Sequence, residues 1–277
     1  MMTASLLSRL TSRRKQILTW VTLCGGLMLF WACATVTETG RSAVRLFPES
    51  QMVSMASGEF DKMKVAGPIS NDPEMNARIQ RIGKRVASVV NTVVPPEKWE
   101  FVVFDDDTTV NAFALPGGKV GVYTGLIKLA GSDDEIACVI GHEVAHVTAQ
   151  HGNERVSQQT IAQAGGMAVQ YGVKNKTEQT QQLAMMAYGL GAQYGLLLPY
   201  SRTHEREADQ IGLLYAARAG YNPNAAVTFW QKMAAKGGAQ PPQFLSTHPS
   251  NGDRIQRLQA QMPMAMVEYE KSPFKGK

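Results

Sequence analysis

Apolar residues recur at helical spacing along most of this chain and at strand spacing in one short region. Two early segments, residues 48–64 and 71–91, place apolar side chains three and four positions apart, which gives a helix one buried stripe. The second segment opens on Asn71-Asp72-Pro73-Glu74, where a capping residue is followed by a proline and an acid, and it ends before Pro95-Pro96. Both segments are therefore predicted helices.

Three short runs rich in β-branched and aromatic residues follow, at residues 99–104, 110–115 and 120–124. Pro116-Gly117-Gly118-Lys119 is a turn between the second and third runs, so these two are expected to pair as a hairpin. Such a hairpin is either scaffold or an exposed edge to which an extended peptide adds as another strand.

The next helix is expected to start at Ser132, a capping residue followed by three acids that suit the positive end of a helix. Its apolar pattern continues through His151. Residues 162–200 are rich in Gly, Met, Ala and Gln, and their uncharged stretch is shorter than the about 20 residues of a membrane span. We interpret this region either as a helical hairpin packed on the core or as a mobile cover or membrane-contacting element over a cleft.

Pro199 is expected to break this region, and three further helices follow, beginning near residues 201–203, 222 and 253. Helices with one small sheet predict an α+β fold that is mostly helical, with the small sheet or hairpin next to the helix after Ser132. We expect one domain over residues 48–262 and a basic, flexible tail over residues 263–277.

The net charge of +5 gives no case for a nucleic-acid partner. Four of the basic residues precede residue 16, which leaves 24 basic against 23 acidic residues in the rest of the chain; the four are Arg9, Arg13, Arg14 and Lys15. The remainder is close to neutral, so its charge does not favour binding to a phosphate backbone.

Those four charges precede an uncharged, apolar run over residues 16–32, the order found in an export signal. Three endings are considered. In the first, Cys33 is the lipid-bearing cysteine of a lipoprotein, with the small residue Ala32 before it but Phe30 at the position where leucine is usual. In the second, signal peptidase cuts after Ala34. In the third, the segment stays as an uncleaved anchor. We favour the first, which makes residues 1–32 a signal peptide and residues 33–47 a polar tether, and which anchors the chain to a membrane by a lipid on Cys33.

Only three cysteines are present, and two of them, Cys24 and Cys33, lie in or at the end of the signal. Cys138 is then the one thiol of the folded body, which excludes an internal disulfide. It precedes His142 by four residues and so lies near the same helix face. It is either a metal ligand or, as we favour, a buried apolar thiol.

The chemistry of the chain centres on Gly141-His142-Glu143-Val144-Ala145-His146. Residues four apart on a helix differ by about 40° in direction, so both imidazoles can reach one metal ion. Glu143 is turned by about 100° from His142, which suits a general base beside the metal rather than a ligand. The motif predicts a zinc hydrolase, most simply a peptidase.

A catalytic zinc site has three protein ligands and an open position, so a third ligand is required. His151 points away if the helix stays regular, and a structural or surface role is expected for it. His204 is possible, but Glu205 is the stronger candidate because Glu205 and Asp209 share one face of a helix. Glu205 would bind the metal, and Asp209 would orient a ligand histidine through its other ring nitrogen.

These motifs together resemble the membrane-associated zinc metallopeptidases, the family that includes the HtpX-type, BepA-type and mitochondrial Oma-type proteases and the CAAX prenyl protease. The resemblance rests on the HEVAH and SRTHEREAD sequences around His142 and Glu205, and on Thr247-His248-Pro249-Ser250. The run from Asn111 to Gly118 is similar to the edge strand of that family. We expect neither the repeat domain of BepA-type members nor the several spans of HtpX, so the expected resemblance is to small bacterial lipoprotein metallopeptidases.

The resemblance implies a zincin-like domain with one Zn²⁺, held by His142, His146 and Glu205, with Glu143 as the base. It also implies that Asp209 acts as a proton donor. The spacing of the residues instead favours a role in orienting a ligand histidine. His248 matches a histidine that either gates the metal or steadies the oxyanion. The edge-strand residues would bind the substrate backbone; they are Asn111, Ala112, Phe113 and Ala114.

We therefore expect an endopeptidase that cleaves misfolded or unassembled envelope proteins. The expected location is the periplasmic side of a bacterial cell envelope, lipid-anchored at the outer membrane, because Ala34 after Cys33 is typical of lipoproteins sent there. The alternative is an envelope chaperone or assembly factor with a latent or mainly structural zinc site, which the Met- and Gly-rich region favours.

Overall fold

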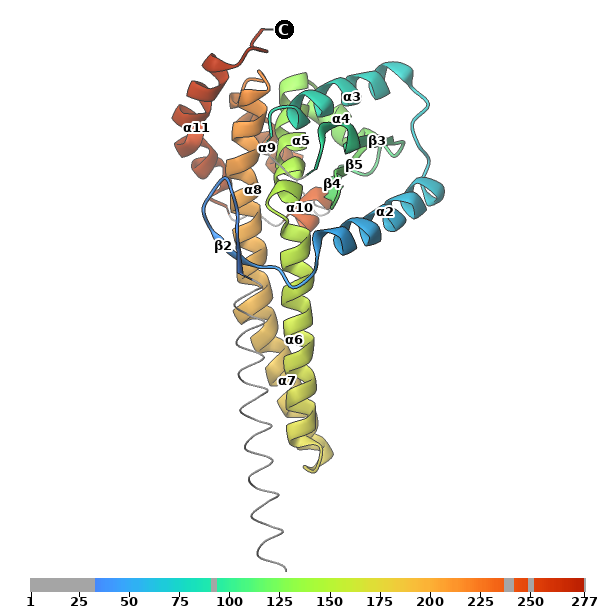
Figure 1. Cartoon of the computed structure of the whole chain (residues 1–277), viewed down its shortest axis with the longest axis vertical. Helices are drawn as coiled ribbons and strands as arrows, with labels where there is room; N and C mark the ends of the chain where they lie inside the picture. The colour runs from blue at the N-terminus through green and yellow to red at the C-terminus, as the bar shows by residue number, and fades with distance from the viewer. Residues whose placement is uncertain (1–32, 91–93, 237–241, 249–251, 277) are drawn as a thin grey trace, which may run out of the picture.

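Two antiparallel helices, α5 (Asp133–Thr148) and α8 (Leu198–Arg218), lie side by side at the centre of the molecule (Figure 1). The computed structural model describes residues 33–90, 94–236, 242–248 and 252–276. Other helices and one three-stranded sheet pack around the central pair and enclose a single apolar core. The predicted α+β fold, mostly helical with a small sheet beside the metal helix, is confirmed.

The close approach of α5 and α8 depends on two glycines that face each other. A Cβ atom on Gly141 would lie 2.6 Å from the carbonyl oxygen of Gly212, and one on Gly212 would lie 2.5 Å from the backbone nitrogen of His142. Both contacts are with backbone, which cannot rotate aside. The absence of these side chains lets α5, which carries His142 and His146, lie close against α8, which carries Glu205.

We expect Gly212→Ala to lower the free energy of unfolding by about 1–3 kcal/mol or more, because a Cβ here forces the two central helices apart. Gly189→Ala in α7 (Glu178–Ala192) is the matched control, since nothing lies within 4 Å of a Cβ there. The control should stabilise by about 0.5–1 kcal/mol, as Ala does in a helix interior. Urea unfolding of both variants measures the difference, and equal stabilities would contradict the proposed close contact.

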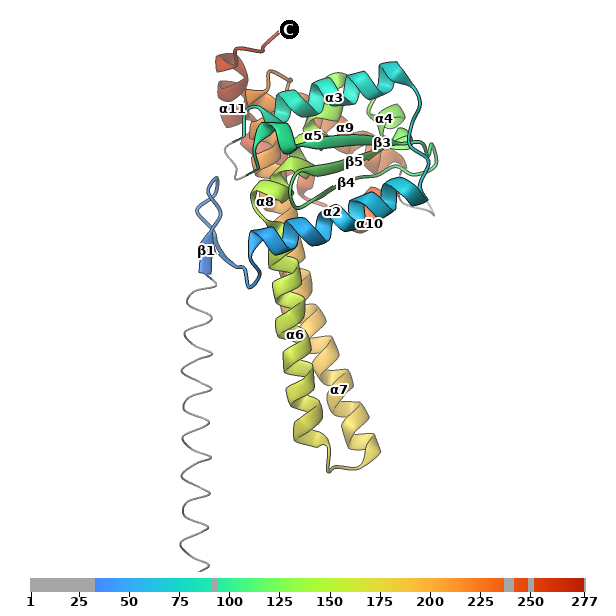
Figure 2. The same cartoon turned by 45° about the vertical axis from the view of Figure 1, so that its right-hand side comes forward.

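The sheet has the strand order β3-β5-β4, with β3 (Glu100–Phe104) parallel and β4 (Ala112–Leu115) antiparallel to β5 (Lys119–Tyr123). It lies between α3 (Pro73–Ala87) on one face and α2 (Glu49–Ala66) on the other (Figure 2). Strand β4 is at the edge of the sheet and packs against α5. The sheet thus presents its edge strand β4 to α5.

Local sequence signals place the helix starts. Asp72 accepts hydrogen bonds from the backbone nitrogens of Glu74 and Met75 at the start of α3, and Ser132 accepts one from Glu135 at the start of α5. The remaining short elements complete the body; they are η1 (Pro96–Lys98), α4 (Thr124–Ala130), α9 (Asn224–Lys236) and α10 (Gln243–Thr247).

The expected continuous helix through His151 is wrong. Helix α5 ends at Thr148, and α6 (His151–Val173) starts after Gln150, whose φ of 55° and ψ of 36° place it in the left-handed region. One non-glycine residue in that region is enough to end a right-handed helix and to change its direction. The consequence is that His151 no longer has the direction that a regular helix would give it.

Helices α6 and α7 form a hairpin that projects from the body as a stalk (Figures 1 and 2). Every residue of α7 is at least partly exposed, so the hairpin is not packed on the core along its length. The predicted break at Pro199 is also wrong. A π-helical turn, η2 (Gln193–Leu197), leads directly into α8, and Pro199 occupies the first turn of that helix, where its missing N–H costs least.

The structure differs from the expected domain limits at both ends. Residues 33–47 are not a loose tether, because β1 (Cys33–Thr35) and β2 (Ser42–Val44) form a hairpin whose Val36 and Ala43 are buried. Residues 263–271 are not a flexible tail but the second half of α11 (Arg254–Lys271). The helix continues past Pro263 because Leu258 and Ala265 are buried on one stripe, which offsets the proline.

The predicted signal, residues 1–32, lies outside the described residues, and its function as a signal stays a prediction. Among the helices of the described part, none combines the length and hydropathy needed to cross a bilayer.

Candidate metal centre

Four buried side chains from three parts of the chain converge at the middle of the α5–α8 pair. They are His142 and His146 on α5, Glu205 on α8, and His248 directly after α10. One nitrogen or oxygen from each lies within 4.8 Å of the others. The Nε2 atoms of His142 and His146 are 3.1 Å apart, and Nε2 of His142 lies 3.3 Å from Oε2 of Glu205.

The spacing of these atoms fits a zinc ion. Tetrahedral zinc with Zn–N bonds of about 2.0–2.1 Å puts neighbouring ligand atoms about 3.3–3.4 Å apart. The remaining separations in the cluster are 3.5 Å from His146 Nε2 to Glu205 Oε1, and 3.2 to 3.3 Å from His248 Nδ1 to Glu205 and His142. The donors also suit zinc, because it prefers imidazole nitrogens and carboxylate oxygens, and the cluster offers three imidazoles and one carboxylate.

The charge balance of the cluster favours a bound cation. Burial alone would raise the pKa of Glu205, but His146 and His142 lower it well below its usual value. Burial alone would lower the pKa of His142, but Asp209 and Glu205 outweigh it and raise that pKa to about 9. The cluster therefore attracts positive charge, carried either by protons or by a metal ion.

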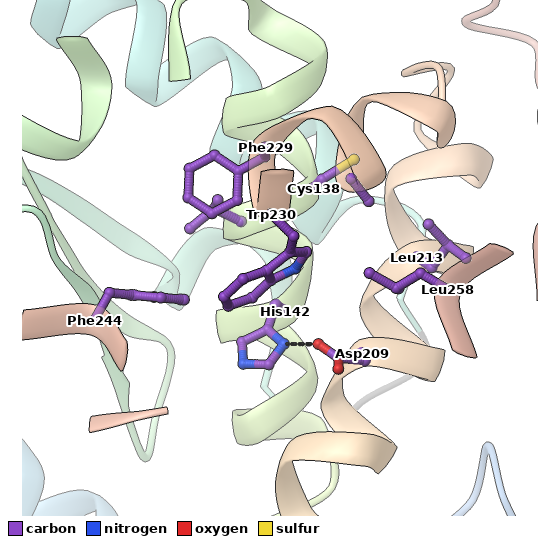
Figure 3. A pocket seen from close by; sticks show the side chains of 10 residues that line it. Cys138, His142, Asp209, Leu213, Phe229, Trp230, Phe244 and Leu258 are labelled. Carbon is purple, nitrogen blue, oxygen red and sulfur yellow. Dashed lines mark ion pairs between the residues drawn. The ribbon is translucent and has the colours of Figure 1, made fainter. Parts of the chain in front are cut away.

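His142 is fixed from behind by a second pair of charges. Its Nδ1 lies 3.0 Å from Oδ1 of Asp209, whose carboxylate is held by Nε and Nη2 of Arg254 at 2.7 and 2.8 Å. Figure 3 shows Asp209 directed at His142, with Trp230 and Phe244 near the other side of the imidazole. Ring and carboxylate are therefore held in one orientation.

His146 is fixed by a different route. Its Nδ1 lies 2.8 Å from Nδ1 of His151, and Nε2 of His151 lies 3.0 Å from Oε2 of Glu207. The expectation that His151 points away from the metal helix is wrong, because the left-handed residue Gln150 turns it back toward His146. Burial lowers the pKa of His151 to about 4, so its ring is neutral at neutral pH.

A cavity of about 250 Å³ opens beside the cluster and is lined by Glu143 and His146 on one side and by Phe113 and Ala114 of β4 on the other. Glu143 is 1% exposed, and its Oε1 lies 3.3 Å from Nε2 of His248. The four predicted substrate-binding residues divide into two groups. Phe113 and Ala114 line this cavity, whereas Asn111 and Ala112 are buried behind it.

Asn111 has a supporting position instead. Its side-chain oxygen accepts hydrogen bonds from its neighbour Ala112 and from the Thr247 hydroxyl, the residue before His248. Arg155 is the last residue of α6 that lines the cavity. The more distant part of the α6–α7 stalk therefore does not cover it. In the described structure residues 162–200 do not cover this cavity, so the cover interpretation finds no support, and His248 lines the cavity instead.

Two other candidates from the sequence lie elsewhere. Cys138 is buried in the apolar pocket behind His142, where burial raises the pKa of its thiol, as expected for an inert core cysteine (Figure 3). His204 is buried away from the cluster, and its Nε2 lies 3.2 Å from Glu154.

Sequence reasoning missed Arg254 and the residues behind His146, which are Arg41, Glu154 and Glu207. Arg254 carried one signal: it is a basic residue at the first position of α11, where the helix dipole disfavours positive charge, so it needs a buried anionic partner. The others gave no comparable signal, because an acid in the first turn of a helix, such as Glu154, is ordinary, and no local pattern marks Arg41 or Glu207.

The comparison with known proteins agrees with this geometry. A sequence profile of peptidase family M48 matches residues 73–262, which contain every residue of the cluster. The chain belongs to peptidase family M48. The resemblance inferred from its motifs is confirmed, and so is its class as a metallopeptidase.

This M48 chain is similar to proteins of two named groups. It is 37% identical to the mitochondrial metalloendopeptidase OMA1 of Schizosaccharomyces pombe over 70% of this chain and 55% of the relative, and 35% identical to that of Saccharomyces cerevisiae over 67% and 53%. It is 27% identical to the beta-barrel assembly-enhancing protease of Escherichia coli over 85% of this chain and 50% of that relative. The chain thus spans about half the length of the curated relatives it matches.

The expected location on the periplasmic side of a bacterial envelope, at the outer membrane, is wrong. The mitochondrial relatives have higher identity than the bacterial protease of Escherichia coli, and they point away from that location. Lipid attachment at Cys33 is not tested by any of these observations and stays a prediction.

Proposed function

We propose that this M48 chain is a zinc-dependent endopeptidase that cleaves unfolded or unassembled proteins, with His142, His146 and Glu205 as zinc ligands and Glu143 as general base. The observation that carries the proposal is the convergence of the ligand atoms within 4.8 Å, beside a buried glutamate and a cavity bordered by an edge strand. A zinc ion held there would polarise a peptide carbonyl and lower the pKa of a water molecule.

Glu143 is placed to move protons. It lies on the cavity side of α5, whereas the two histidines direct Nε2 into the cluster. In this proposal its carboxylate takes a proton from the attacking water and returns it to the leaving nitrogen, which one group can do because both atoms are bonded to the same carbon after the attack.

Asp209 is proposed to orient rather than to donate a proton. Its carboxylate is clamped by two nitrogens of Arg254, and burial, which would raise its pKa, is outweighed by Arg254 so that the pKa is lowered. In this proposal an ionised Asp209, 3.0 Å from Nδ1 of His142, keeps the proton on that nitrogen and leaves Nε2 of the ring with its lone pair free for zinc.

His248 is proposed to gate the site. Its Nδ1 lies within 3.3 Å of His142 and Glu205, so it would compete with water for a zinc ion held by the other three residues. The imidazole stacks on the ring of Phe244, with the two ring centroids 4.3 Å apart. In this proposal it must move before a substrate can enter. In this proposal the described arrangement is the resting form of the site.

The substrate class follows from the edge strand. A peptide paired along β4 would offer its backbone to the sheet and its side chains to Phe113 and Ala114, which favours extended segments over particular sequences. Folded proteins expose few such segments, so unfolded or unassembled chains are the proposed substrates. Attachment of the chain to a membrane through a lipid on Cys33 remains part of the proposal.

Metal removal tests the proposed function. The purified chain should cleave casein, lose that activity in 1,10-phenanthroline, and recover it when one equivalent of zinc is returned after the chelator is removed. Cleavage that persists in the chelator at the starting rate would contradict the proposal.

A second candidate function is a chaperone or assembly factor with a latent zinc site. The observation that favours it is the stalk, which exposes a stripe of apolar side chains at helical spacing, with Leu183, Met186 and Leu190 on α7 and Tyr194 on the adjoining η2. A Glu143→Gln chain that still prevents aggregation of an unfolded protein, in an assay where a stalk variant such as Leu190→Gln does not, would support this function.

A further inference from the structure

We propose that Arg41, in the turn of the N-terminal β1–β2 hairpin, is a positioning residue for the metal centre: through Glu207 and His151 it fixes the ring of His146 with Nε2 directed at the metal. The inference deepens the proposed function and rests on it. It assigns a role at the site to a residue that lies outside the part of the chain matched by the family profile.

The contacts form an unbroken series of short polar distances. Nε and Nη2 of Arg41 lie 2.8 and 2.6 Å from Oε2 of Glu207, and that same oxygen lies 3.0 Å from Nε2 of His151. Nδ1 of His151 then lies 2.8 Å from Nδ1 of His146. His151 is 1% and Glu207 is 5% exposed, so water does not compete for these hydrogen bonds.

The series determines which nitrogen of each ring carries the proton. A carboxylate only accepts, so Nε2 of His151 is the nitrogen that donates to Glu207. A neutral ring has one N–H, so Nδ1 of His151 accepts, and it accepts from Nδ1–H of His146. Nε2 of His146 is left with its lone pair, which is the form a metal ligand needs.

Arg41 keeps this polarity by keeping Glu207 a pure acceptor. Its guanidinium also binds Glu154 through two nitrogens at 2.7 and 2.8 Å, and Thr39 of the same hairpin donates to Glu207. One planar group therefore joins two buried carboxylates, which suits arginine better than lysine. His142 is supported in a parallel way by Asp209 and Arg254, so each zinc histidine is backed by a series that ends at an arginine from a distant segment.

A second metal ion is the competing interpretation of these residues, because His151, Glu154 and His204 have ligand atoms within 4.8 Å of one another. Two features oppose it. The rings of His151 and His204 are stacked, with centroids 4.4 Å apart and planes at 18°, so their lone pairs do not converge. The positive charge that balances Glu154 and Glu207 is already supplied by Arg41 at 2.6 to 2.8 Å.

The test measures zinc affinity of the full chain by competition with a chelator, using zinc alone as the probe. We expect Arg41→Met to weaken zinc binding by about 10- to 100-fold, the usual effect of removing a partner of a ligand histidine. Arg41→Lys should lie between Arg41→Met and the wild type, since it restores charge without the two-nitrogen contact. Glu207→Gln should weaken binding like Arg41→Met, and it decides the matter if Arg41→Met does not fold.

Arg218→Met is the matched control. Arg218 also ties the N-terminal hairpin to α8, through Glu38 at 3.5 Å, and it binds Glu268 at 2.7 Å, but it does not touch the series behind His146. If Arg41 merely anchors the hairpin, both methionine variants will bind zinc alike. The absorption spectrum of the cobalt-substituted chain is a second measure, which should change in Arg41→Met and not in Arg218→Met.

Three outcomes would overturn either the role of Arg41 or the proposed function on which it rests. Equal zinc affinities for Arg41→Met, Glu207→Gln and Arg218→Met would remove the positioning role. A second zinc in the wild type that is lost in His204→Ala would make the cluster a metal site instead. A wild type that binds no zinc would defeat the proposed function itself, which separates that failure from a failure of the role of Arg41.

Discussion

Glu143→Gln is expected to lower the rate of casein cleavage by about 10²- to 10⁴-fold, the range that a general base contributes, with bound zinc unchanged. The glutamine keeps the size of the side chain at a position that is 1% exposed, so packing around α5 is preserved. It cannot take a proton from water. The proposed ligand atoms of His142, His146 and Glu205 are untouched, which is why metal content should stay at the wild-type level.

The measurement is kcat/KM on a fluorescent casein together with zinc per chain. Glu59→Gln, on the exposed side of α2, is the matched control and should cleave at the wild-type rate. Wild-type cleavage by Glu143→Gln at full zinc occupancy would show that Glu143 is not the base. Loss of zinc in that variant would instead assign Glu143 a part in holding the metal.

Arg254→Met is expected to lower the free energy of unfolding by about 3–5 kcal/mol, the effect of breaking a buried ion pair on one side. Arg254 is 3% exposed, and it reaches Asp209 with two nitrogens and Glu205 at 3.1 Å. Its guanidinium also lies over the ring of Trp230, 3.6 Å from the centroid. Removing it leaves two carboxylates buried without their cation, and Asp209 is freed to turn away from His142.

Urea unfolding of the zinc-free chain measures this effect. Arg257→Met, one turn along the same helix, is the control, because its partner Asp253 is 45% exposed and such pairs contribute about 0–1 kcal/mol. Returning zinc should recover part of the loss in Arg254→Met, since the ion would balance Glu205. Equal stabilities of the two variants would contradict the account of Arg254 as the cation that holds the site together.

Sequence predicts the part of the site whose residues lie within one turn of the same helix. His142 and His146 share a face because they are four residues apart, and Glu205 and Asp209 share one for the same reason. The need for a third zinc ligand then selects Glu205 from a short list. The caps at Asp72 and Ser132 are equally local, which is why the helix starts agree with the structure.

What sequence could not predict depends on contacts between distant segments. The direction of His151 follows from a single left-handed residue, Gln150, and no pattern marks a glutamine for that conformation. Arg41 meets Glu207 across more than a hundred and sixty residues. Helical spacing indicates which face a side chain lies on, but the partner on the opposite face depends on how helices pack, and here that packing depends on Gly141 and Gly212.

The central claim, that one zinc ion is held by His142, His146 and Glu205, is tested most directly by anomalous diffraction at the zinc edge from crystals of the zinc-loaded chain. We expect one anomalous peak, within about 2.0–2.2 Å of Nε2 of both histidines and of the Glu205 carboxylate. A peak only at His151 and His204, or none between α5 and α8, would contradict the account.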